Sequence, residues 1–75
     1  MSIETPTAAE IAANYAASLD SVTLITELMA LSSRDADQTA SVARNVDHLE
    51  LMVAKTYWTS EDLAPLNAAI ASGKS

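Results

Sequence analysis

Apolar residues recur every three or four positions in the first third of the chain, the spacing that places them on one side of an α-helix. The core side predicted for this helix carries Ile11, Tyr15, Leu19, Val22, Ile25 and Met29. Glu10, Asn14 and Ser21 fall on the opposite side. No segment of the chain alternates apolar and polar residues as a half-buried strand does. A long amphipathic helix is therefore expected first.

The start of this helix has two candidates. Thr5 followed by Pro6 fits an N-cap with proline at the first helical position, whereas Thr7 with Glu10 fits a capping box. The apolar pattern continues to about Leu31, so the helix is expected to span some 25 residues, roughly 37 Å at 1.5 Å per residue.

A second helix is predicted after the polar run at residues 32–35. Asp35 and Gln38 form its expected capping box, and the helix runs to about Tyr57. Its predicted core stripe consists of Val42, Val46, Leu49 and Val53, extended by Tyr57. The short connection favours an antiparallel αα-hairpin with the first helix.

A third, shorter helix is predicted after Trp58. Thr59 is placed as its N-cap with Asp62 in the first turn, and Trp58 and Leu63 occupy the two positions of a hydrophobic staple. Trp58 is therefore expected to anchor the hinge between the second and third helices.

Pro65 leaves the form of the third helix open. Proline disfavours the helical conformation at Ala64, so the sequence allows either a kinked helix or a single turn followed by a separate helix. Leu66 and Ile70 share one face with Leu63 in both cases. Gly73, the one glycine of the chain, is expected at the C-cap.

Together these elements predict an all-α fold in one domain spanning residues 1–75: two long antiparallel helices and a short C-terminal helix in a small helical bundle. With 75 residues and no cysteine, the chain has a small core and no disulfide to reinforce it. We therefore expect contact with a partner or with further copies of the chain.

Charge and hydropathy narrow the class of partner. The formal net charge is -6, which does not provide the cationic surface that nucleic acids require. No apolar run approaches the roughly 18 residues of a membrane span. The first residues are acidic and polar, which is not typical of a secretory signal. A protein partner is expected, with no nucleic acid and no membrane.

Catalytic and metal-binding residues are not apparent. The neighbouring carboxylates of Asp35 and Asp37, and of Glu61 and Asp62, fall at predicted helix starts, where capping and the helix dipole explain them. His48 has no usual metal ligand one helical turn away, and no acidic residue stands at the spacing needed to orient it. We therefore expect no enzymatic activity, no cofactor and no metal site.

Arg44, His48 and Lys55 share the polar face of the second helix and form a small basic stripe. Such a stripe could contact an acidic partner surface, but charged residues are usual on any solvated helix face. The solvated face is the favoured interpretation.

Both long helices carry apolar residues that the core stripes do not use. The candidate partner interface consists of Leu24, Leu28, Leu31, Leu51 and Met52. A helix that is apolar on two sides is expected to be buried on two sides. Either the third helix covers the leucines of the first helix, or this second side contacts another chain.

The sequence resembles small uncharacterised helical proteins encoded by tailed bacteriophages, marine ones in particular. The resemblance lies in residues 8–16 (AAEIAANYA), 44–55 (RNVDHLELMVAK), 57–63 (YWTSEDL) and 67–70 (NAAI). It implies a phage context, and that family brings no assigned activity or binding residues.

Two functions follow as hypotheses. The first is a non-enzymatic structural or accessory protein of a phage particle, associated with capsid or tail, which packs its helices against further copies or a larger virion protein. The alternative is a small acidic regulator in the host cytoplasm, which binds and inhibits a host protein through its charge. A homo-oligomer is expected under the first hypothesis.

Overall fold

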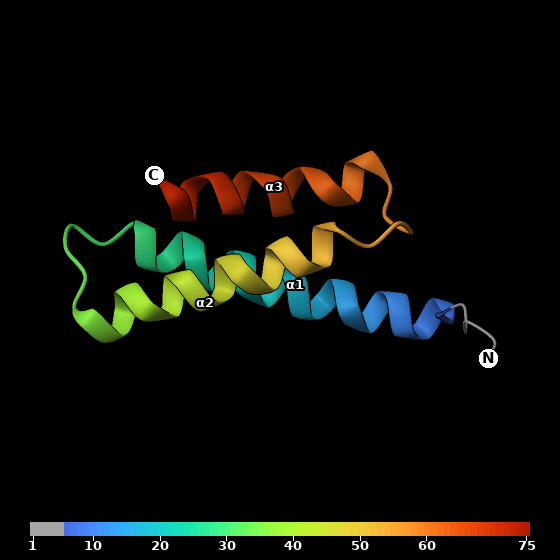
Figure 1. Cartoon of the computed structure of the whole chain (residues 1–75), viewed down its shortest axis with the longest axis horizontal. Helices are drawn as coiled ribbons and strands as arrows, with labels where there is room; N and C mark the ends of the chain where they lie inside the picture. Colours follow the sequence, from blue (N-terminus) through green and yellow to red (C-terminus); the bar gives the residue numbers. More distant parts are fainter. Residues whose placement is uncertain (1–5) are drawn as a thin grey trace.

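The structure, a computed structural model, describes residues 6–75 and contains three helices within them (Figure 1). They are α1 (Ala8–Met29), α2 (Ala36–Val53) and α3 (Ser60–Lys74). No strand occurs in this part of the chain. The all-α bundle expected from the sequence is confirmed.

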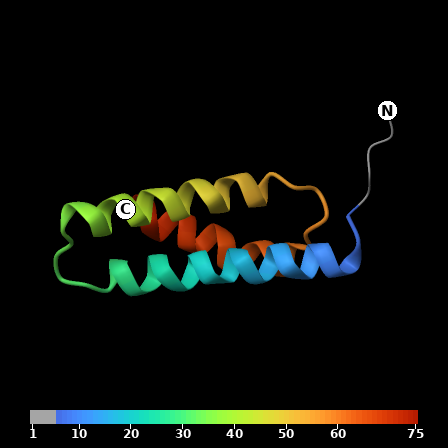
Figure 2. The ribbon, with the colours of Figure 1, turned by 90° about the horizontal axis from the view of Figure 1, so that it is seen from below.

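The helices α1 and α2 run antiparallel, and α3 returns along one side of the pair (Figure 1). Seen from below, α1 and α2 lie in front and α3 lies behind them (Figure 2). α3 therefore covers one side of the α1–α2 pair and leaves the opposite side uncovered.

All three helices begin with a complete capping box, in which the N-cap side chain and the side chain three residues later bind each other's backbone N–H. The pairs are Thr7 with Glu10, Asp35 with Gln38, and Thr59 with Asp62. Of the two starts considered for α1, the structure has the one at Thr7. The alternative cap, Thr5, lies outside the described residues.

Both long helices end earlier than their apolar patterns predicted. α1 stops at Met29 rather than about Leu31, and Arg34 returns from the loop to donate from Nη1 to the carbonyl oxygens of Leu28 and Leu31, each at 3.2 Å. A cation at this position also favours the negative end of the helix dipole. The side chain of Arg34, from the polar run that follows α1, thus stabilises the C-terminal end of this helix.

α2 ends at Val53 rather than about Tyr57, and here the side chain of Trp58 provides the stop. Its indole Nε1–H donates to the carbonyl oxygen of Met52 at 2.7 Å, which satisfies one of the unpaired groups at the helix end. Trp58 is therefore joined to the end of α2, and its ring also lies beside that of Tyr15 in α1.

α3 is one helix through Pro65, neither split nor interrupted. Proline is tolerated because the carbonyl that loses its partner belongs to Glu61, an exposed residue that water can reach. Gly73 is not a C-cap, since it lies within the helix and has no positive φ. Its position is explained by packing, because a Cβ there would collide with Cγ2 of Val46.

The core contains fewer large side chains than the patterns predicted. Its buried apolar members are Ile25, Val42, Val46, Leu49, Leu66 and Ala69. The prediction that Leu19 is buried was wrong, since this side chain is 39% exposed. Ser18 and Ser21 are buried on α1 instead, at 0% and 4% exposure.

The buried serines indicate that the core-facing side of α1 is rotated relative to the prediction. Asn14 and Ser21 were expected on the side opposite the core, yet Asn14 faces the α2–α3 connection (residues 54–59) and Ser21 faces α2. Asn14 Nδ2 donates to the hydroxyl of Tyr57 at 3.1 Å, and Ser21 Oγ lies 2.8 Å from His48 Nδ1. Ser18 Oγ is satisfied by the carbonyl of Asn14 at 2.9 Å. Polar contacts thus make up part of the α1–α2 interface.

Candidate protein-interaction surface

The side of the α1–α2 pair that α3 does not cover is the candidate site (Figure 2). Hydrogen bonds fix how α1 is turned. Ser21 points toward His48 in α2, and Asn14 points toward Tyr57 in the α2–α3 connection. The Tyr15 hydroxyl donates to the carbonyl of Asp62 in α3 at 3.0 Å. Successive residues of a helix are about 100° apart around its axis. Going around α1 from the side that faces α3, one reaches the side that faces α2 and then the uncovered side. The residues of α1 on this side are Ala13, Ala17, Asp20, Leu24 and Glu27.

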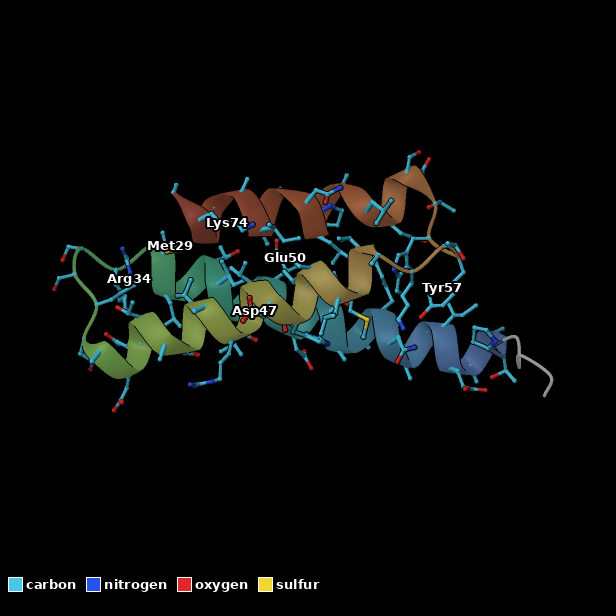
Figure 3. The ribbon with its side chains drawn as sticks, viewed as in Figure 1. Met29, Arg34, Asp47, Glu50, Tyr57 and Lys74 are labelled. Carbon is cyan, nitrogen blue, oxygen red and sulfur yellow. The ribbon has the colours of Figure 1, made fainter. Side chains whose placement is uncertain are left out.

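The rotation of α2 about its own axis is fixed by its contacts in the same way. Glu50 points toward α3, where its Oε2 accepts from Lys74 Nζ at 2.7 Å (Figure 3), and His48 points toward α1. The residues of α2 on the uncovered side are Asp37, Ser41, Arg44, His48 and Leu51. We call these two rows together the open face. Each row advances by alternating steps of three and four residues, the spacing of a helix seam that packs against another helix.

The five residues proposed from the sequence as a partner interface divide into two groups. Leu24, Leu31 and Leu51 are 44%, 41% and 71% exposed. Leu28 is half-buried and packs against the core, and Met52 is half-buried as well. α3 therefore leaves Leu24 and Leu31 uncovered, and the exposed leucines of the proposed set are the ones available to a partner.

His48 departs from the solvated face expected for it. It is half-buried and its Nδ1 lies 2.8 Å from the Ser21 hydroxyl, so it links α2 to α1, whereas Arg44 is exposed. A serine hydroxyl beside an imidazole is also the start of a nucleophilic dyad. Ser21 is only 4% exposed, and its contact with His48 joins α1 to α2.

A shallow apolar groove, which the sequence did not predict, lies at the end of the bundle where α1 and α3 begin. Its lining residues come from the first half of α1, the α2–α3 connection and the start of α3: Ala8, Ile11, Ala12, Tyr15, Trp58 and Asp62. The groove has a volume of about 310 Å³. The ring of Trp58 stands 5.3 Å from that of Tyr15 and 4.5 Å from that of Tyr57, between centroids. Spacing along the chain could not reveal it, because residues from opposite ends form it.

The chemistry of this groove is limited. Its one carboxylate, Asp62, accepts from the backbone N–H of Thr59 as part of the α3 capping box. The remaining lining is apolar. The groove therefore has no free charged group with which to orient a polar ligand.

Other kinds of site are not apparent in residues 6–75. No three side chains of histidine, cysteine, aspartate or glutamate come together there as metal ligands. Within the same residues, none of the helices has the length and apolar content needed to span a membrane.

Comparison with known proteins gives no relative: no family model, no curated protein and no solved structure matches the chain.

Proposed function

We propose that the chain is a non-enzymatic structural or accessory protein of a phage particle, associated with capsid or tail, and that it binds its partner through the open face. The observation that carries this proposal is the exposure of Leu24 and Leu51 on a side of the bundle that α3 leaves bare. Its phage context rests on the sequence resemblance in residues 8–16, 44–55, 57–63 and 67–70.

The energetics favour association through this face. Full burial of a leucine side chain contributes roughly 1.5–3 kcal/mol, and Leu51 at 71% exposure has most of that still to gain. Two antiparallel helices also present ridges of side chains, against which a partner helix can pack. The partner is thus a second copy, a helix of a larger virion protein, or both.

The proposal that the chain is not an enzyme rests on the chemistry of its polar groups. Ser21 is shielded from solvent, and the carboxylates of Glu10, Asp35 and Asp62 are occupied in capping boxes. These groups stabilise helix ends and helix contacts. The one that lines the groove, Asp62, is held by the capping box of α3 and has no second carboxyl group or histidine beside it in the lining, with which it could form a general acid and base pair.

Mass spectrometry of purified particles tests the proposal. Particles would be prepared from a phage that carries the gene in wild-type form, with Leu51→Asp, or with Ala68→Asp. The last variant adds the same charge to an exposed position of α3, away from the open face. We expect the chain in wild-type and Ala68→Asp particles and its depletion from Leu51→Asp particles. Wild-type particles without the chain would refute the proposal.

A second candidate function, an acidic regulator that inhibits a host protein in the cytoplasm, is favoured by the surface charge. Asp20, Glu27, Asp37 and Asp47 are exposed, and the ion pair found in residues 6–75 uses none of them. Such a surface attracts basic patches on other proteins, and salt lowers the rate at which the two proteins associate. Capture of a basic host protein that is lost in high salt would support this function over the first.

A further inference from the structure

We infer that two copies of the chain pair through their open faces, with α1 of each copy lying on α2 of the other and Glu27 opposite Arg44 of the second copy. This inference rests on the use of the open face in the proposed function, and it names the partner and the arrangement.

The two rows of the open face differ in charge. The α1 row carries Asp20 and Glu27 and no cation, whereas the α2 row carries one cation, Arg44, and one carboxylate, Asp37. The ion pair of residues 6–75 joins Lys74 to Glu50 on another side of the molecule. Glu27 and Arg44 therefore remain available to a second copy.

Symmetry determines which rows meet. If the two-fold axis runs parallel to the helices, α1 of one copy lies on α2 of the other, and the acidic α1 row faces the row that carries Arg44. If the axis runs across the helices, α1 lies on α1 and the two acidic rows repel. The charge distribution thus selects the first arrangement.

The register within one chain fixes the register of the pair, because rotation about a parallel axis keeps each residue at its level along the bundle. The Ser21–His48 contact sets one level, and moving from it toward Glu27 on α1 corresponds to moving back toward Arg44 on antiparallel α2. Glu27 of one copy therefore comes level with Arg44 of the other. Asp37, the acidic residue of the α2 row, lies nearer the start of α2 than Arg44 does. It is therefore not level with Asp20 or Glu27 of α1.

The apolar residues fit the same arrangement. Leu51 lies between the levels of the Ser21–His48 and Asn14–Tyr57 contacts, as Ala17 does on α1. Leu51 of one copy is thus level with Ala17 of the other, a small residue that leaves room for a leucine. A large side chain set against a small one is the usual form of close helix packing.

The size of the face can be compared with that of known interfaces. With 22 and 18 residues, α1 and α2 are about 33 Å and about 27 Å long, and two helices side by side are about 20 Å wide. The shorter helix limits the footprint to about 540 Å², before the area of protruding side chains is counted, which is below the roughly 800 Å² that each partner buries in a standard interface. We therefore expect a small interface.

Charge reversal in two separate variants tests the arrangement by sedimentation equilibrium. Glu27→Arg places two arginines opposite each other in its homodimer, and Arg44→Glu places two glutamates there. In a mixture, the arginine at position 27 of one variant meets the glutamate at position 44 of the other, and the second contact keeps the native Glu27 and Arg44. We expect each variant alone to dimerise about tenfold more weakly than wild type, and the 1:1 mixture to recover wild-type association.

This design separates contacts between copies from contacts within one chain, because mixing cannot repair the latter. An attraction between the net charges of the two variants does not explain the recovery of dimerisation in the mixture either. The net charge of -6 becomes -4 in Glu27→Arg and -8 in Arg44→Glu, so both variants stay negative and repel. Circular dichroism would establish that both variants keep their helices.

Three results would overturn the inference: a monomeric wild type, single variants that dimerise as well as wild type, or a mixture no stronger than its components. Failure here is distinct from failure of the proposed function. A monomer found in phage particles leaves that function standing, and a dimer absent from particles refutes it while the arrangement holds.

Discussion

Gly73 shows how a single residue reflects the packing of whole helices. The sequence suggested a C-cap, because glycine is frequent there, but the residue lies inside α3 where that helix approaches α2. Ile25 and Val42 would also be in contact with a Cβ at this position, each at 3.4 Å. The absence of a side chain is what allows the close approach.

Gly73→Ala is therefore expected to destabilise the fold by about 1–2 kcal/mol, although alanine favours helices more than glycine does. The stiff, branched Val46 cannot move aside without displacing α3. Urea unfolding measures this loss, with Ser72→Ala at the exposed neighbouring position as the control. A Gly73→Ala variant more stable than wild type would contradict the packing explanation.

Ser21 and His48 illustrate what hydrophobic periodicity cannot predict. A serine counts as polar in any pattern, so Ser21 was assigned to the outside, whereas Leu19 was assigned to the core and is 39% exposed. The hydrogen bond that compensates for the burial of the Ser21 hydroxyl is made with His48 of another helix, 27 residues away in sequence. Only the packed structure contains that information.

Ser21→Ala is expected to lower the free energy of unfolding by about 1 kcal/mol, because His48 Nδ1 loses its partner at a half-buried position. Thr23→Ala is the matched control, since the Thr23 hydroxyl binds only its own helix, at the carbonyl of Leu19, on an exposed side. Chemical denaturation of both variants makes the comparison. Equal stability of the two would show that the Ser21–His48 contact contributes nothing.

At the level of the elements, helix starts were predictable and helix ends were not. A capping box is local, and Thr59 with Asp62 can be recognised from four consecutive residues. The ends of α1 and α2 depend on Arg34 and Trp58, whose side chains return from the loops to bind carbonyl groups of Leu28, Leu31 and Met52. Whether a loop side chain returns in this way is decided by tertiary packing.

Trp58→Phe separates the hydrogen bond at the end of α2 from the packing of the ring. The variant keeps an aromatic ring near Tyr15 but cannot donate to the carbonyl of Met52, so a loss of about 1 kcal/mol is expected. Thermal unfolding monitored by circular dichroism measures it, with Thr56→Ala in the same exposed connection as the control. A melting temperature equal to that of wild type would exclude a stabilising role for this bond.

For the whole molecule, the candidate interface was only partly predictable. Leu24, Leu31 and Leu51 could be identified because the helix periodicity leaves them off the core stripes, and all three are exposed. Leu28 and Met52 were included for the same reason, but the actual rotation of α1 and α2 draws both toward the interior. Periodicity predicts the angle between two residues on a helix well, and the direction of the neighbouring helix less well.

Association through the open face should make stability depend on concentration, because binding between folded copies stabilises them by mass action. The melting temperature of the wild-type chain is expected to rise with protein concentration. Leu51→Asp should remove this rise while leaving the melting temperature of the dilute protein nearly unchanged, since the side chain is 71% exposed. Ala68→Asp, on the outside of α3, should behave as wild type. A rise that persists in Leu51→Asp would place the contact elsewhere.

Paramagnetic broadening of leucine methyl signals tests most directly whether copies meet through the open face. With a soluble gadolinium chelate and dilute protein, Leu24, Leu51 and Leu19 should all broaden, while the fully buried Leu66 should not. On concentration, we predict that Leu24 and Leu51 become protected and that Leu19, which lies on a different side of α1, stays broadened. Equal broadening of Leu24, Leu51 and Leu19 at every concentration would contradict the proposed pairing.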